Sequence, residues 1–217
     1  LSDACEKAIA EGKVDAVMLG RQLVADPYWP QKAMEDREED IVPCLRCLNC
    51  YHIATEHANT QCSVNPRFRR EDRVPLCLSK ADRAKRVVIV GGGPAGMKGA
   101  LTAAERGHQI ILLEKSGRLG GNLCYADYGD HKADLKKYRD YLINQLARTT
   151  VEGRLNTAAT PELVRNLAPD ALMVAVGADF IQPPIPGAEY ARQAVSVYPE
   201  LDRVRGRIVI VGGGAIG

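Results

Sequence analysis

The sequence lacks long apolar runs and any strong excess of one charge. The net charge is +2 over 217 residues, so no strong electrostatic field favours nucleic acid or a membrane surface. No stretch approaches the roughly 20 apolar residues that a membrane helix needs, and no signal-peptide pattern is present. Aromatic residues are scarce as well. In the basic stretch 67–86, Phe68 is the only aromatic residue. This scarcity favours a solvated linker over a nucleic-acid site.

The composition, with 46% hydrophobic and 26% charged residues, is that of a globular protein with a sizeable core. The amino-terminal patterns predict a helix over 3–12, a buried strand over 14–19 and a helix from 26 to about 38, an order typical of an α/β layer or barrel. Gly20 and Arg21 follow the strand. They form either a surface turn or a phosphate site. In a phosphate site, the glycine would let backbone N–H groups approach the phosphate, and the arginine guanidinium would add charge-assisted hydrogen bonds.

Four of the seven cysteines lie within nineteen positions. Cys44, Cys47 and Cys50 are separated by two residues each, and Cys62 follows after eleven more. A non-helical loop with this spacing can wrap its sulfurs around one inorganic core, which predicts an iron–sulfur cluster. Zinc, buried free thiols and disulfides are the alternatives. Cysteines at a metal-binding spacing favour a reducing compartment, so we expect a cytoplasmic protein.

A dinucleotide-binding pattern begins at residue 86. It consists of a strand over 86–90, a G-x-G-x-x-G turn over 91–96, a helix over 97–107, a strand over 110–113 and then Glu114. The first glycine permits a tight turn, the second admits a pyrophosphate, and the third lets helix and strand pack closely. The helix N-terminus would face the phosphates, and Glu114 can accept from ribose hydroxyls. A glycine-rich turn without a ligand is the alternative.

Further patterns follow this turn. A second glycine-rich loop, 117–122, is either a surface turn or a backbone that lies against a flat cofactor. We expect a core-facing helix over 131–148, a short helix over 161–167 and a buried strand over 171–175. Finally, 207–217 repeats the strand and glycine turn of 86–96 at a spacing of 121 residues, which predicts a second nucleotide site.

With these motifs in place, the chain resembles the carboxy-terminal part of the multi-domain flavin reductases that include 2,4-dienoyl-CoA reductase, 2-enoate reductase and trimethylamine dehydrogenase. The resemblance implies the end of an FMN-binding TIM barrel over 1–40, a [4Fe–4S] loop over 41–66 and a linker over 67–85. It also implies an incomplete Rossmann-like domain for FAD or ADP over 86–205 and the start of an NAD(P)H domain over 206–217. Because the sequence begins without methionine and stops inside a glycine-rich turn, we expect a piece of a longer chain.

The resemblance also implies site residues. The expected metal ligands are Cys44, Cys47, Cys50 and Cys62. The expected cofactor-binding residues are Gly20 and Arg21 for FMN phosphate, and Gly91, Gly93, Pro94, Ala95, Gly96, Glu114, Lys115, Gly120, Gly121, Ala175, Gly177, Gly212, Gly214 and Gly217 for the nucleotides. No catalytic acid or base can be named.

The resemblance implies a flavoenzyme that passes electrons from NAD(P)H through FAD, the cluster and FMN to an activated alkene. Expected partners are a small-molecule substrate, the rest of the parent chain and a second copy of the protein, with no nucleic acid or membrane. The two-residue gap between the second and third cysteines is closer to the amine dehydrogenases, so amine oxidation with ADP in the FAD site is an alternative. A non-catalytic nucleotide- and metal-binding module is a third hypothesis.

Overall fold

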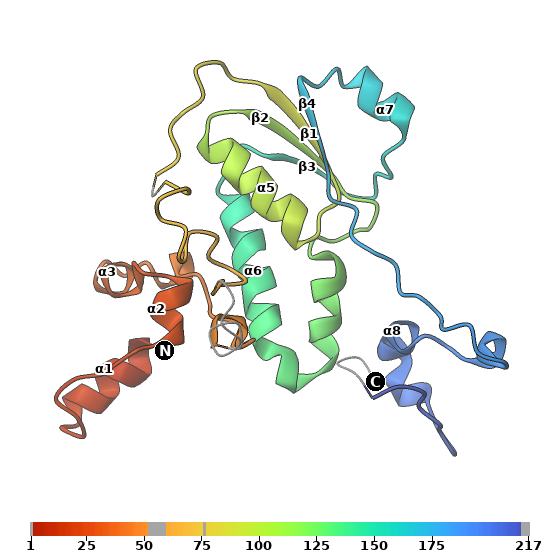
Figure 1. Cartoon of the computed structure of the whole chain (residues 1–217), viewed down its shortest axis with the longest axis horizontal. Coiled ribbons are helices and arrows are strands. Elements are labelled where there is room, and N and C mark those ends of the chain that lie inside the picture. Colours follow the sequence, from red (N-terminus) through yellow and green to blue (C-terminus); the bar gives the residue numbers. More distant parts are fainter. Residues whose placement is uncertain (1, 52–59, 76, 214–217) are drawn as a thin grey trace.

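The computed structural model describes residues 2–51, 60–75 and 77–213, and its centre is a parallel four-stranded sheet (Figure 1). The strand order is β3-β2-β1-β4, and Val88 of β1 is paired with Ile111 of β2 and Leu172 of β4. The strands are β1 (Arg86–Val90), β2 (Gln109–Leu113), β3 (Glu152–Arg154) and β4 (Ala171–Val174). The α/β prediction is therefore confirmed.

Short and long helices surround this sheet. The α-helices are α1 (Ser2–Ala10), α2 (Arg21–Ala25), α3 (Trp29–Met34), α5 (Pro94–Glu105), α6 (Ala133–Ala147), α7 (Pro161–Asn166) and α8 (Ala194–Val197). The 3-10 helices are η1 (Glu38–Asp40), η2 (Gly121–Tyr128), η3 (Asp130–Lys132), η4 (Ala188–Tyr190) and η5 (Tyr198–Arg203). Within the described residues, none of these helices combines the length and apolar character needed to cross a membrane.

The core lies where α5 covers one face of the sheet and α6 packs on α5. Ile89, Leu112, Met97 and Leu142 are each at most 1% exposed. Their burial follows from the sequence, because aliphatic strands fill both sheet faces and the 3.6-residue repeat of α6 turns one apolar stripe inward. The predicted elements at 86–90, 97–107, 110–113, 131–148 and 161–167 are confirmed within three residues at each end.

Three local predictions are wrong. Residues 14–19 form no strand, and Met18 is 97% exposed. The helix expected from Asp26 begins at Trp29 and ends at Met34, and a further helix, α2, precedes it. Residues 207–211 also form no strand, although they repeat the sequence pattern of β1. Each of the two failed strands has no hydrogen-bonded neighbour among the described residues, and an aliphatic run cannot form a sheet alone.

The burial expected for β4 is also wrong. This strand lies at an edge of the sheet. Met173 faces α5, where its side chain lies against Gly99, while Leu172 and Val174 on the opposite face are 49% and 65% exposed.

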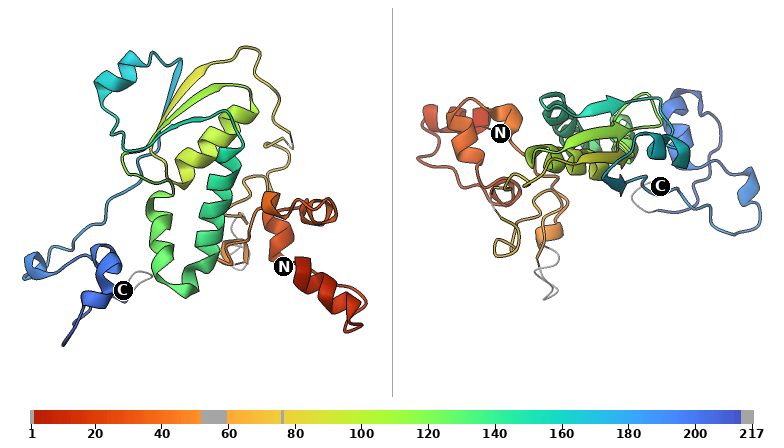
Figure 2. Two further views of the ribbon diagram at one scale, coloured as in Figure 1. Left: turned by 180° about the vertical axis from the view of Figure 1, so that it is seen from behind. Right: turned by 90° about the horizontal axis from the view of Figure 1, so that it is seen from above.

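The two ends of the chain lie on opposite sides of the sheet domain. Figure 2 shows α1, α2 and α3 at one end and the segment that carries α8 at the other. The cysteine loop lies beside the amino-terminal helices, on the side of α6 away from α8 (Figure 1).

Candidate functional site

The glycine turn between β1 and α5 has the backbone geometry that its sequence predicts. Gly91 has φ +108°, and a Cβ on it would lie 2.3 Å from the carbonyl oxygen of Ala175. A Cβ on Gly96 would lie 1.8 Å from the carbonyl oxygen of Gly91. Around Gly93, in contrast, the nearest atom would be 3.9 Å away. The outer two glycines are thus required by close backbone packing, while the central one leaves open space in front of the turn.

Glu114, at the end of β2, is 7% exposed and directly supports this turn. Its Oε2 accepts from the N–H of Gly92 at 2.6 Å, and its Oε1 accepts from the N–H of Ser116 at 2.8 Å. Burial of the carboxylate acts to raise its pKa, but the hydrogen bonds from Ser116 and Gly92 outweigh it, so the pKa of Glu114 is lowered. A carboxylate oxygen accepts more than one bond, so a ribose hydroxyl can still be bound there.

The hydrogen bonds of Glu114 predict a pH-dependent stability. Glu114→Gln is expected to lower the free energy of unfolding by about 1–3 kcal/mol at pH 7, because an amide group would face a backbone N–H. Since the folded pKa is lowered, the carboxylate stabilises the fold above its unfolded pKa of about 4.3, and this contribution is lost as the pH falls further. Urea unfolding between pH 7 and pH 3 measures the difference. Glu162→Gln, at an exposed site in α7, is the control; a gap that stays constant with pH would contradict the prediction.

The second glycine-rich loop lies directly against the first. The N–H of Gly120 donates to the carbonyl of Gly92 at 2.9 Å, and a Cβ on Gly121 would lie 3.0 Å from the Cα of Gly93. Gly120 has φ +121°, and a Cβ there would meet the side chain of Arg139 at 2.7 Å. The two loops, which the sequence presents as separate motifs, therefore form one surface.

The side chain of Arg139 packs against Gly120 of the second loop. The sequence analysis did not identify this residue. It is 9% exposed and donates to Asp127 and Asp140 at 2.7 Å each. An arginine beside the apolar stripe of α6 was the available signal, because a buried arginine requires acidic partners.

The remaining nucleotide candidates are divided between this surface and the end of the chain. Pro94 and Ala95 form the first turn of α5, and Lys115 is exposed next to Glu114. Beyond β4, the N–H of Ala175 donates to Val90 at 2.8 Å, two residues before Gly177. Gly212 has φ +105°, close to that of Gly91, but no atom of the described residues lies within 4 Å of a Cβ placed on it. Gly214 and Gly217 lie outside the described residues.

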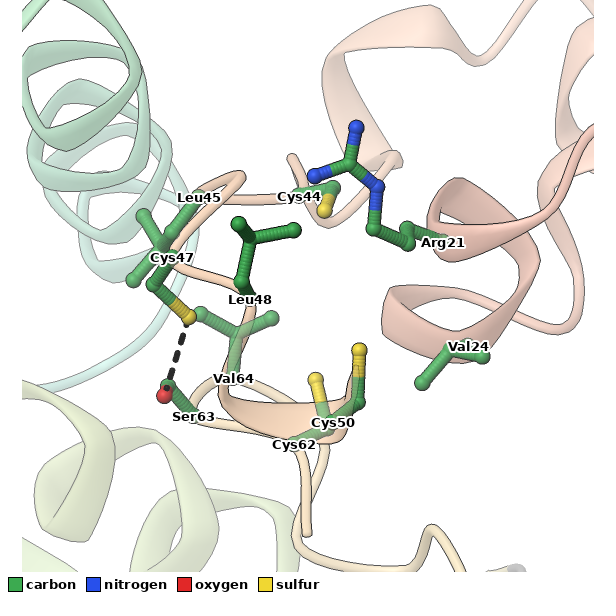
Figure 3. A pocket seen from close by; sticks show the side chains of 10 residues that line it. All are labelled: Arg21, Val24, Cys44, Leu45, Cys47, Leu48, Cys50, Cys62, Ser63 and Val64. Atoms are coloured by element: carbon green, nitrogen blue, oxygen red, sulfur yellow. Dashed lines mark hydrogen bonds between the residues drawn. The ribbon is translucent and has the colours of Figure 1, made fainter. Parts of the chain in front are cut away.

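All four predicted cysteine ligands line one small hollow (Figure 3). The empty space measures about 290 Å³, part of it open to solvent. The sulfurs of Cys44, Cys50 and Cys62 are turned into it, and the side chain of Arg21 lies at its edge. Cys47 is turned toward Ser63, with 3.3 Å between Sγ and Oγ. Burial raises the pKa of the Cys50 thiol, and the neighbouring Cys62, Cys44 and Cys47 raise it further.

The sulfurs are nevertheless not gathered around a single point. Among the described residues, no three His, Cys, Asp or Glu side chains are placed to hold one metal ion. The geometry of one zinc ion is demanding, because four ligands must each lie about 2.0–2.3 Å from it. In an iron–sulfur cluster, cysteines bind different iron atoms, so a wider arrangement of thiols is required. The donor set, four thiols around one hollow, is of the kind that an iron–sulfur cluster uses.

A larger, more open hollow adjoins the first. It is lined by Gly20, Arg21, Val24, Leu48, Cys50, Tyr51 and Phe68. Arg21, Val24, Leu48 and Cys50 line both hollows. The structure therefore brings the predicted phosphate-binding pair, Gly20 and Arg21, next to the cysteine loop.

Three side chains, all missed by sequence reasoning, bind the cysteine loop to α2. Gln22 donates to the carbonyl of Val42 at 2.9 Å and accepts from the N–H of Cys44 at 3.2 Å. The buried Asp26 accepts from the N–H of Val42 at 2.9 Å and from Lys32 at 2.7 Å. At the other end of the loop, Asn65 donates to the carbonyl of Val24 at 2.8 Å. These bonds fix both ends of the loop against one helix.

Ion pairs join the same region to α6. Arg46, within the cysteine loop, pairs with Asp134. Arg148 pairs with Asp40 at 2.6 Å and with Glu39 at 3.1 Å. Buried apolar residues from both sides, including Ala25, Val64 and Leu142, belong to one continuous core. The cysteine loop is therefore packed against the nucleotide domain.

Comparison with known proteins places this geometry in a family. The family model described as pyridine nucleotide-disulphide oxidoreductase matches residues 85–217. The NADH oxidase of Thermoanaerobacter brockii is 41% identical, and the match covers 98% of this chain and 34% of that protein. The cinnamate reductase of Clostridium sporogenes is 38% identical, with 97% of this chain and 31% of that protein covered.

Among solved structures, a 2-naphthoyl-CoA reductase in complex with 2-naphthoyl-CoA superposes with a TM-score of 0.83 at 34% identity, covering 94% of this chain and 31% of that one. The chain thus spans about a third of the length of the curated relatives it matches. It belongs to the pyridine nucleotide-disulphide oxidoreductase family, and its homologues are flavoproteins of the NADH oxidase and 2-enoate reductase type, as its motifs predicted.

Proposed function

We propose that this chain is the electron-carrying part of an NAD(P)H-dependent iron–sulfur flavoprotein that reduces an activated alkene. The observation that carries the proposal is the shared wall of the two hollows. Arg21 and Cys50 line both the hollow that contains the four thiols and the hollow beside Gly20. Electron transfer between two cofactors requires that their sites lie close together, and these two hollows adjoin each other.

In this proposal Cys44, Cys47, Cys50 and Cys62 hold a [4Fe–4S] cluster. The donor set supports it: four thiols line one hollow, and thiolate is the ligand that such clusters use. Cys47, which now contacts Ser63, would turn its sulfur inward. Flavins on either side of a cluster would connect a two-electron hydride donor to a one-electron carrier.

The nucleotide side of the proposal rests on residues around the first turn. The open space in front of Gly93 and the N-terminus of α5 suit a pyrophosphate, while Glu114 suits a ribose. Gly120, Gly121 and the Ala175–Gly177 segment would border the same FAD, together with Pro94, Ala95 and Lys115. Gly212, Gly214 and Gly217 would begin the NAD(P)H site.

The amino-terminal part of the proposal concerns FMN. Gly20 and Arg21 would bind its phosphate, with residues 1–40 as the end of a TIM barrel, 41–66 as the cluster loop and 67–85 as the linker. In that arrangement, residues 14–19 would gain a neighbouring strand from outside this sequence. The names of the relatives, cinnamate reductase and 2-naphthoyl-CoA reductase, support a conjugated acid or acyl-CoA as the substrate class.

Anaerobic purification of the protein as its gene encodes it tests the assignment. Iron, acid-labile sulfide, zinc, FAD, FMN and ADP are measured per polypeptide. We expect about four iron and four sulfide, together with both flavins. Stoichiometric zinc without sulfide would contradict the cluster.

A second candidate, an amine dehydrogenase with ADP in the FAD site, is supported by the two-residue gap between Cys47 and Cys50. The same measurement separates the two candidates. Released FAD favours the reductase, whereas released ADP without FAD favours amine oxidation.

A further inference from the structure

Gln22 links α2 to the start of the cysteine loop. It is the second residue of α2 and follows Arg21, which lines both hollows. Its half-buried side chain crosses to the cysteine loop, twenty residues further along the chain. There its amide nitrogen donates to the carbonyl of Val42, and its amide oxygen accepts from the N–H of Cys44.

These two bonds enclose Pro43, which has no N–H of its own. The backbone segment that leads into Cys44 is therefore held on either side of Pro43, at the carbonyl of Val42 and at the N–H of Cys44. Asp26 adds a third bond by accepting from the N–H of Val42. No comparable bond from α2 reaches Cys47 or Cys50 among the described residues, so Gln22 acts on the first cysteine of the loop.

The bond from Cys44 also has an electronic consequence. Backbone N–H groups near a cluster can donate to its sulfur atoms, and such bonds are among the factors that set its reduction potential. The N–H of Arg46 does point at a sulfur, donating to Cys44 Sγ at 3.4 Å. The N–H of Cys44 instead donates to the side-chain oxygen of Gln22, so this N–H does not donate to a sulfur atom of the hollow.

We propose that Gln22 is a positioning residue that fixes Cys44 beside Arg21 and keeps the reduction potential of the cluster low by capturing the N–H of Cys44. This inference rests on the proposed function, since it requires a cluster at the four cysteines. It adds a residue that acts on the cluster without binding it.

Two substitutions separate positioning from general stability. Gln22→Leu removes both bonds and frees the N–H of Cys44, so the midpoint potential is expected to shift upward. Gln22→Glu keeps an acceptor for that N–H but adds a negative charge, so the potential is expected to shift downward. Gln145→Leu is the matched control, because Gln145 also bonds a backbone carbonyl and a side chain across the chain, at Glu39 and Asp40. Its potential is expected to stay at the wild-type value.

The experiment uses the protein as its gene encodes it, purified anaerobically. Iron and sulfide are counted first, and a reductive titration is then followed by electron paramagnetic resonance. Opposite shifts in the two Gln22 variants support the inference. Loss of iron from Gln22→Leu, with Gln145→Leu intact, supports the positioning, because Cys44 is then no longer held in place by the two bonds of Gln22.

Two results would overturn the inference and are distinguishable. Unmoved potentials, or shifts of the same sign, in variants with full iron and sulfide contradict the role of Gln22 alone. Absence of iron and sulfide from the wild-type protein contradicts the proposed function, and this inference with it.

Discussion

Replacing Gly96 with alanine is expected to destabilise the nucleotide domain by at least about 3 kcal/mol. The added Cβ would lie 1.8 Å from the carbonyl oxygen of Gly91. No rotamer change can relieve this distance, because the backbone fixes the position of both atoms. Gly91 cannot move away, since it is itself pressed against Ala175. Urea unfolding followed by circular dichroism measures the loss.

Gly93→Ala is the matched control for Gly96→Ala in the same turn. Its Cβ would meet nothing closer than 3.9 Å, and its φ is −74°, so the fold is expected to keep its stability within about 1 kcal/mol. The same variant is expected to weaken nucleotide binding, because the methyl group occupies the open space in front of the turn. Equal unfolding midpoints for the two variants would contradict the packing argument. Unchanged FAD content in Gly93→Ala would contradict the proposed approach of the pyrophosphate.

Replacing Cys62 with alanine is expected to remove most of the bound iron and sulfide. Cys62 is the only candidate ligand that reaches the hollow from the returning side of the loop, and its sulfur faces Cys44 and Cys50. Without it, one iron of a four-iron core loses its protein ligand. Iron and sulfide per polypeptide are measured after anaerobic purification.

Cys77→Ala is the control for Cys62→Ala. Cys77 is exposed and does not line the hollow, so full iron content is expected. An iron content in Cys62→Ala equal to that of the wild type would show that these cysteines are not the cluster ligands. Loss of iron in both variants would point to a general loss of folding, which circular dichroism would detect.

The sequence predicts the β1–α5–β2 unit well because each of its requirements is local. Aliphatic runs of four or five residues define the strands, and the glycines at 91, 93 and 96 permit only one kind of turn. Pro94 opens the helix, and Glu114 ends the second strand. The close backbone packing around Gly91 and Gly96 agrees with the reasons given for these two glycines.

The same reasoning fails at 14–19 and 207–211 because a strand is not a local structure. Both segments are rich in apolar residues, and Ile208 to Val211 are 57% to 80% exposed. A helix satisfies its own backbone groups, whereas a strand requires a neighbour. The exposed face of β4 has a related cause. Apolar residues indicate that a face of a strand can be buried, but they do not indicate which element covers it.

The sequence by itself determined which loops are candidates for cofactor binding. The spacing of the four cysteines and of the turn glycines depends on covalent geometry and backbone sterics, which are fixed within a few residues. Only the tertiary structure decided which of these loops meet. Arg21 and Cys50 line the same hollow, and Gly121 lies on Gly93, through contacts between residues about 28 positions apart. The bonds of Gln22, Asn65 and Arg139 that hold these loops have no periodic pattern, because packing selects a hydrogen-bond partner by position in space and not by spacing in the chain.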